Sequence, residues 1–237
     1  MELTKQHNIR HKYLMLETAY YRRDYTGEVI AKDDRHFLIK PKDIFYRQNN
    51  AGKAIVVGNG ITRNNKTFEM LLKSNSNRPL LGYKIVYACN GAAWDLPADY
   101  YVISNRLLMA HLHDTEQWQK FFMPCDLFMD YDTTNMIPVV SNMDAGSMAV
   151  FLACFDGNDE IFLFGFDGNS DNVYEGKPGY ERSADVSTWE INLALIMRAF
   201  PDHRFYRVGS GKTPVLWQKM PNFIETNYKE AIYLGDF

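Results

Sequence analysis

Gly58, Asn59 and Gly60 stand directly after a short apolar run, Lys53–Val57. Glycines at the end of a buried strand let the backbone approach a ligand closely. The helical apolar spacing of Thr67–Leu72 predicts a helix soon after this turn, and free backbone N–H groups ahead of a helix suit a phosphate. The turn therefore predicts a site for an anionic, nucleotide-like ligand. Because the third glycine of a full G-x-G-x-x-G pattern is missing, an ordinary strand-to-helix turn is the alternative.

Three more polar residues follow apolar runs in the same way, namely Asn90, Asn105 and Asp167. In a parallel sheet, ligands bind beyond the carboxyl ends of the strands. Asparagine both donates and accepts hydrogen bonds, which suits ribose hydroxyls, base edges and phosphates. Asparagine and glycine are also common turn residues, so the prediction of one shared crevice depends on their recurrence and not on any single position. We expect the Asp167 carboxylate to face that crevice, with capping of the next segment as the alternative.

The elements that would position these residues alternate between two patterns. Strand-like runs are followed by segments with helical apolar spacing, which is typical of a mostly parallel sheet covered by helices on both faces. The fold class predicted is α/β and Rossmann-like. The strand-like runs are Lys53–Val57, Tyr83–Ala88, Asp99–Ser104, Asp126–Met129, Glu160–Phe164 and His203–Val208, and the helical patterns are Thr67–Lys73, Leu107–Phe122, Gly146–Phe155 and Thr188–Phe200.

Two parts of the chain differ in composition. Residues 1–50 form a charged, tyrosine-rich N-terminal extension with a helical pattern around Tyr13–Tyr21 and apolar runs at Glu28–Ile30 and His36–Ile39. A polar connector ends this extension. Residues 51–237 are predicted to be the nucleotide-binding domain.

Composition narrows the class of protein further. The chain has 237 residues, of which 46% are hydrophobic, and a net charge of -3. This charge gives no general reason to bind nucleic acid or an anionic membrane. Neither an apolar stretch of about 20 residues nor a secretory signal is visible, and three cysteines without paired or metal-ligand spacing indicate reduced thiols. We expect a soluble cytoplasmic protein without a transmembrane segment, and the sequence leaves its oligomeric state open.

An ordered set of these elements resembles the bacterial lipooligosaccharide sialyltransferases over roughly residues 53–210. The set is also similar to a wider group that includes motility-associated sugar-transfer proteins and archaeal-type hydroxymethylpterin diphosphokinases. It comprises Gly58-Asn59-Gly60, Cys89-Asn90, Ser104-Asn105, Asp144–Ala149 at a helix start, and Glu160–Asp167.

The resemblance implies a Rossmann-like domain that holds the nucleotide of an activated donor, CMP in the sialyltransferases. Gly58, Asn59 and Gly60 would lie against the phosphate and ribose. Asn90 and Asn105 would contact the nucleotide, and Ala145 with Gly146 would contact the donor where that family has Ser-Gly. The arginine shortly before that Ser-Gly and the general-base histidine of the family have no counterpart in this chain.

The loop before the last long helical pattern holds the candidates for the missing chemistry. Sugar transfer needs a base for the acceptor hydroxyl and neutralisation of the departing phosphate. Asp185 is the candidate base and Arg182 the candidate cation, while Tyr174 and Tyr180 would hydrogen-bond the leaving group. The alternative is that Asp185 caps the following helix. Because residues 169–187 form a long, glycine-punctuated connection, we expect a mobile lid over the donor.

Two other motifs have a weaker basis. Asp130-Tyr131-Asp132 has the D-x-D form of metal-dependent glycosyltransferases, but acidic strand ends are common and we assign no metal ligands. Gly209–Thr213 lacks the first glycine of a P-loop, with Pro214 following where a helix should start, so we interpret it as a turn.

The function predicted is a nucleotide-sugar-dependent, sialyltransferase-like glycosyltransferase that acts on a glycan or other hydroxylated acceptor. The alternatives are a pterin-type diphosphokinase and a non-catalytic nucleotide-binding or assembly protein. No bound cofactor is firmly implied, because the CMP-type donor would be a substrate.

Overall fold

The computed structural model of the protein describes 27–32, 37–41, 52–64, 66–78, 83–112, 120–124, 127, 135–137, 143–167, 172–180 and 186–237. Of these, 27–32, 37–41, 135–136 and 186–187 are described by their backbone alone. No helix in these ranges is long and apolar enough to cross a bilayer.

Eight strands of the described chain form one sheet in the order β10-β9-β8-β3-β4-β5-β6-β7. Every neighbouring pair in it is parallel, so the sheet fits the α/β fold class predicted from the alternating patterns. The central strands are apolar on both faces, as a sheet covered on both sides requires. The strands are β3 (Lys53–Val57), β4 (Ile85–Cys89), β5 (Tyr100–Val102), β6 (Phe121–Met123), β7 (Asn135–Met136), β8 (Glu160–Phe164), β9 (Arg204–Val208) and β10 (Phe223–Thr226).

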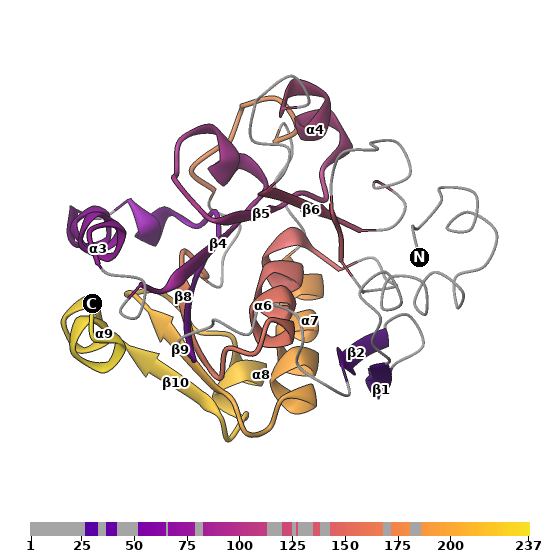
Figure 1. The fold of residues 1–237 in the computed structure, drawn as a ribbon, viewed down its shortest axis with the longest axis vertical. Helices are drawn as coiled ribbons and strands as arrows, with labels where there is room; N and C mark the ends of the chain where they lie inside the picture. The colour runs from indigo at the N-terminus through magenta and orange to yellow at the C-terminus, as the bar shows by residue number, and fades with distance from the viewer. Residues whose placement is uncertain are drawn as a thin grey trace.

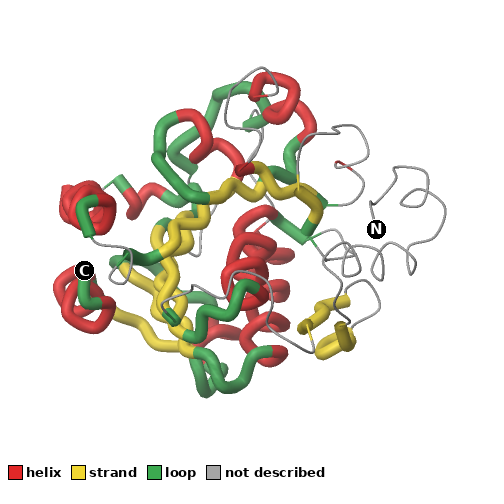
Figure 2. The backbone as a smooth tube through the Cα atoms, viewed as in Figure 1, coloured by secondary structure: helices red, strands yellow, loops and turns green. Residues whose placement is uncertain are grey.

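Helices cover both faces of this sheet, as Figures 1 and 2 show. One core lies under α6 (Ala145–Phe155), α7 (Val186–Ala199) and α8 (Val215–Gln218), and it includes Val56 and Leu163 from the sheet. The other core lies under α3 (Lys66–Ser76), α4 (Arg106–Leu112) and α9 (Tyr228–Gly235), and it includes Ile55 and Phe164. Successive strand residues thus alternate between the two cores, because side chains of a strand point to opposite faces.

The sheet changes direction beside β3. From β3 the chain builds outward through β4 to β7, and then it returns to place β8, β9 and β10 on the other side of β3. The carboxyl ends of β3 and β8 therefore flank the switch point, which is where open α/β sheets bind their ligands. The turns at Gly58 and Gly165 lie at these two strand ends.

The predicted segments and the observed elements differ in several places. The helical pattern predicted over Leu107–Phe122 is wrong at its end, because α4 stops at Leu112 and Phe121 and Phe122 belong to β6. The C-terminal β10 and α9 were not predicted. In addition, α8 begins directly after Pro214, although the turn predicted at Gly209–Thr213 is present.

The N-terminal apolar runs form strands of their own. In this region β1 (Gly27–Lys32) and β2 (Phe37–Pro41) pair antiparallel as a separate two-stranded sheet, and β1 lies beside α7 (Figure 1). The helix predicted around Tyr13–Tyr21 and most of the strand predicted at Asp126–Met129 lie outside the described residues.

Candidate functional site

The turns after β3 and β8 are joined through their backbones. The Gly58 N–H donates to the Phe164 carbonyl at 2.8 Å, and the Gly60 N–H donates to the Gly165 carbonyl at 2.9 Å. A Cβ atom on Gly58 would lie 2.5 Å from the Gly165 carbonyl oxygen. Gly58 is therefore required by the approach of two strand ends, independently of any ligand.

Asp167 fills the space beside Gly60. Its carboxylate accepts from the Thr62 backbone N–H at 2.8 Å and from the Thr62 hydroxyl. A Cβ atom on Gly60 would lie 2.4 Å from Asp167 Oδ2. The Asp167 side chain is thus engaged with the turn after β3, and Gly60 makes room for this carboxylate.

Tyr180 lies over the ends of β3 and β4. Its hydroxyl oxygen accepts from Asn59 Nδ2 at 2.9 Å and from the Gly91 N–H at 2.8 Å. Burial raises the pKa of the Tyr180 phenol above its usual range, so the hydroxyl keeps its proton and can donate it. Asn59 Oδ1 is buried and has no hydrogen-bond partner among the described residues.

Asn90 and Asn105 connect neighbouring elements at the same edge of the sheet. Asn90 has a positive φ of 43°, and its Oδ1 accepts from the Ser104 N–H at 2.9 Å, which joins the ends of β4 and β5. Asn105 accepts from the Leu108 N–H at the start of α4 and donates to the Gly179 carbonyl at 2.7 Å. Both side chains lie at the predicted strand ends, and both hold the local structure together.

A buried arginine, Arg63, lies beside this edge of the sheet. Its side chain is only 5% exposed, and its Nη2 contacts Asp95 Oδ1 at 3.2 Å and the Tyr174 hydroxyl. The Tyr174 hydroxyl also donates to Asp95, and burial raises the pKa of Tyr174. The second terminal nitrogen, Nη1, is buried without a partner in the described part of the chain. Within the described chain, Arg63 is thus a buried cation with one terminal nitrogen, Nη1, that has no hydrogen-bond acceptor.

The segment 172–180 is packed down over the strand ends. Tyr174 is buried against Gly91, where any Cβ would lie 2.5 Å from the Tyr174 ring. Trp94 packs edge-on against the rings of both Tyr174 and Tyr180, and the Val173 N–H donates to the Asn59 carbonyl at 2.9 Å. The described part of the predicted mobile lid is therefore a closed cover, which we call the tyrosine cover.

The first turn of α6 borders the same region through Phe166. A Cβ on Gly146 would lie 3.3 Å from the Phe166 ring, which also lies next to Gly58. Ala145 is buried, and Asp144 caps the helix by accepting from the Ser147 N–H at 2.8 Å. An acidic cap stands at this helix start, so a donor phosphate would have to lie to one side of it.

Several predicted residues lie outside the described residues. These are the candidate base Asp185, the candidate cation Arg182 and the D-x-D residues Asp130 and Asp132. Within the described ranges, no group of three His, Cys, Asp or Glu side chains could hold a metal ion. Of the three cysteines, Cys89 and Cys154 are buried free thiols.

Sequence reasoning missed Arg63 and Asp95. Arg63 stands in a polar run, Thr62–Asn65, at the position where G-x-G-x-x-G would have its third glycine. The sequence spacing of Arg63 and Asp95 does not identify them as site residues, because the contact from Arg63 to Tyr174 spans 111 positions in the sequence.

Comparison with known proteins assigns the chain to no family. No protein-family model matches the sequence, and no curated protein matches it. Among solved structures, a similar chain is the sialyltransferase CstII from Campylobacter jejuni in complex with a substrate analogue, CMP-3FNeuAc. The match has 14% sequence identity and a TM-score of 0.41, and it covers 65% of this chain and 79% of that chain. A similarity this remote is no basis for assigning the ligand or the activity of that protein to this chain.

Proposed function

We propose that this chain is a nucleotide-sugar-dependent glycosyltransferase that holds the nucleotide of its donor beneath the tyrosine cover. One observation supports the proposal above the others. Among the described residues, a buried donor without a partner, Arg63 Nη1, and a buried acceptor without a partner, Asn59 Oδ1, belong to the same turn at the switch point of the sheet. Leaving such groups unpaired costs about 1–3 kcal/mol each, and a bound nucleotide would pair them.

The chemistry of these groups matches the parts of a nucleotide donor. Arg63 Nη1 and the Tyr180 hydroxyl proton would donate to the phosphate, whose charge grows as the bond to the sugar breaks. Asn59 Oδ1 would accept from a ribose hydroxyl. Asp185 stays the proposed base and Arg182 a second proposed cation. CMP as the nucleotide, a glycan as the acceptor and the participation of Asn90, Asn105, Ala145 and Gly146 are parts of the same proposal.

The tyrosine cover must open before a nucleotide enters. In the closed structure the Tyr180 oxygen accepts from the Asn59 amide nitrogen and from the Gly91 N–H, so the cover is held down on the strand ends where the nucleotide would lie. Opening exchanges these bonds for bonds to the nucleotide. The cover would then close again over the donor and exclude water from the reacting carbon.

A thermal-shift measurement with a panel of nucleotides tests the proposal. A ligand that binds only the native state raises the melting temperature by mass action. At about 100 times its Kd, CMP or a CMP-linked sugar should raise the melting temperature by about 5–10 °C. A response to ATP with magnesium alone would favour the diphosphokinase alternative. The absence of any response would favour a non-catalytic protein and contradict the proposal.

A further inference from the structure

A hollow lies beside Arg63, on the α3 side of the turn after β3. It is a cavity of about 450 Å³ between α3 and the turn at Asp95–Pro97, and we call it the α3 groove. This volume is within the range of about 300–1,000 Å³ typical of small-molecule sites. Its lining residues are Arg63, Asn64, Phe68, Glu69, Leu72, Lys73, Ser76, Asn77, Asp95, Leu96 and Pro97.

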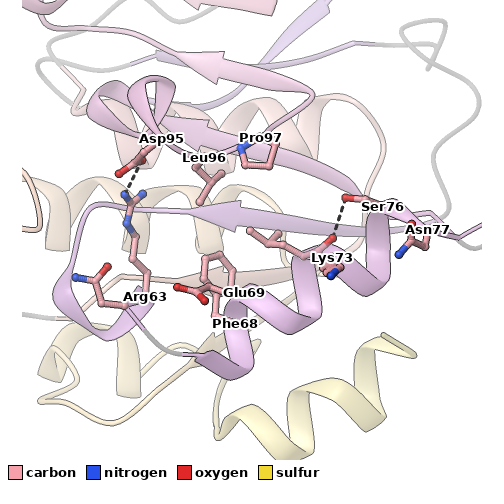
Figure 3. A pocket seen from close by; sticks show the side chains of 11 residues that line it. Arg63, Phe68, Glu69, Lys73, Ser76, Asn77, Asp95, Leu96 and Pro97 are labelled. Carbon is pink, nitrogen blue, oxygen red and sulfur yellow. Dashed lines mark hydrogen bonds and ion pairs between the residues drawn. The ribbon is translucent and has the colours of Figure 1, made fainter.

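Two residues of the groove also contact the tyrosine cover. Arg63 and Asp95 line the groove (Figure 3), and both also contact Tyr174 of the tyrosine cover. From this end the groove follows α3 toward Ser76 and Asn77. The nine helical residues from Phe68 to Ser76 span about 13 Å, so a ligand in the groove would be elongated, with one end next to Arg63 and the tyrosine cover.

The lining combines an apolar strip with a polar rim. Phe68, Leu72, Leu96 and Pro97 supply the strip, and Phe68 and Leu72 share a face of α3 because they are four residues apart. The charged side chains balance one another, with Arg63 and Lys73 against Glu69 and Asp95. A balanced lining gives a phosphate or other anion no net attraction.

We propose that the α3 groove is the acceptor site of the enzyme and takes a neutral saccharide. A sugar ring has an apolar face that would lie on the Phe68, Leu72, Leu96 and Pro97 strip. Its hydroxyl groups would hydrogen-bond the carboxylates and amides of the rim, and the Asp95 side chain, 52% exposed, is available to accept such a bond. The inference rests on the proposed function, since only a donor in the crevice makes a saccharide in the groove an acceptor.

The test uses two tryptophan substitutions on the same helix. Lys73 lines the groove, whereas Met70 lies outside it and is 71% exposed. Lys73→Trp should fill the groove, and Met70→Trp is the matched control. Neutral saccharides (glucose, galactose, N-acetylglucosamine and lactose) and inorganic phosphate are titrated separately into the full-length protein, with binding followed by amide chemical shifts in NMR.

The expected result is that at least one neutral saccharide shifts the amides of the groove residues in the parent protein and in Met70→Trp. Lys73→Trp should weaken this binding at least tenfold. Three results would overturn the inference: no saccharide binds, both variants bind equally well, or inorganic phosphate binds in preference to the saccharides at the Ser76 and Asn77 end of the groove, away from Arg63.

A parallel titration with CMP separates this inference from the proposed function. CMP should shift the amides of the turn after β3 in the parent and in both variants. If CMP shifts nothing while a saccharide still binds the groove, the proposed function fails and the acceptor role fails with it. If CMP binds and no saccharide does, only the α3 groove inference fails.

Discussion

At the scale of single residues, Arg63 is the most informative side chain. It is buried, it is paired through one terminal nitrogen with Asp95, and its other terminal nitrogen has no partner in the described chain. Structures retain a buried donor without a partner where a ligand or a functional constraint accounts for the cost. Arg63 is therefore the position at which the proposed phosphate contact is best tested.

Replacing Arg63 with Met should weaken the binding of CMP much more than the binding of cytidine, which lacks the phosphate. A hydrogen bond to a charged group contributes about 1.5–3 kcal/mol, so the Kd for CMP should rise by about 10- to 100-fold. Isothermal titration calorimetry measures both affinities. Arg78→Met removes an equal charge at an ion pair with Asp236 and should leave both affinities unchanged. An equal loss for cytidine and CMP in Arg63→Met would argue against a phosphate contact.

Gly60 gives a second prediction at this scale. In Gly60→Ala the new Cβ would lie 2.4 Å from Asp167 Oδ2 and 2.7 Å from the Gly165 carbonyl oxygen, so the Asp167 bonds to Thr62 must shift. Overpacking of this kind costs about 1–3 kcal/mol, which urea unfolding measures. Gly146→Ala is the control, because its nearest neighbour would be at 3.2 Å and alanine favours a helix. Similar losses in both variants would show that this contact is not what fixes Gly60.

At the scale of elements, the sequence predicted those strands best whose apolar runs are continuous. The bounds predicted for Lys53–Val57 and Glu160–Phe164 agree with β3 and β8, because central parallel strands are buried on both faces and end abruptly in glycine turns. Short elements near the edge of the sheet were harder to predict from the sequence. Phe121 and Phe122 continue an apolar spacing that begins in α4, and their pairing with β5 and β7 makes them a strand.

Removal of one atom, the hydroxyl oxygen of Tyr180, should make the tyrosine cover open more easily. Tyr180→Phe removes the acceptor of both the Asn59 amide and the Gly91 N–H, so the cover should open more often. Cys89 lies below it at the end of β4, and burial raises the pKa of its thiol to about 12. In the closed protein, labelling of Cys89 by iodoacetamide should therefore keep rising with pH up to about 12.

An open cover changes that pH profile. A thiol in contact with water titrates near its ordinary pKa of about 8.5, so in Tyr180→Phe the labelling of Cys89 should be faster at pH 8.5 and level off above about pH 9. Peptide mapping by mass spectrometry assigns the label to Cys89. Tyr233→Phe, at an 86% exposed position on α9, is the control. Identical profiles in the parent and in Tyr180→Phe would mean that the Tyr180 hydroxyl does not hold the cover closed.

At the scale of the whole molecule, topology determined how much of the site could be predicted. The strand-end rule led to Gly58, Asn90, Asn105 and Asp167 without a structure, and all four lie at the carboxyl edge of the same sheet. The rule does not give side-chain partners. The Asp167 carboxylate fills the space beside Gly60, and Arg63 contacts Tyr174, which is 111 positions away in the sequence. Such contacts, like the closed state of the cover, depend on packing between loops that share no local sequence pattern.

The sheet itself depends at this edge on a second buried arginine, Arg207 of β9. It donates to the Phe166 carbonyl at 2.7 Å, to the Thr213 hydroxyl at 2.8 Å and to Glu225 of β10 at 2.8 Å. It thus joins the turn after β8 to two further strands. Arg207→Met keeps the length of the side chain but removes the donor to the Phe166 carbonyl and the charge opposite Glu225, which keeps its bond from the Thr213 hydroxyl. We expect the free energy of unfolding to fall by about 2–4 kcal/mol in urea titrations.

Arg204 provides the matched control on the same strand. It is 62% exposed and its partner is Glu160, and exposed ion pairs add little to stability because water and salt screen them. Arg204→Met should therefore unfold at nearly the same urea concentration as the parent. The loss in Arg207→Met should also lower the affinity for CMP, since the Gly165–Asp167 turn that Arg207 holds supports the turn at Gly58. Equal unfolding midpoints for the two variants would show that the sheet edge keeps its structure without the Arg207 bonds.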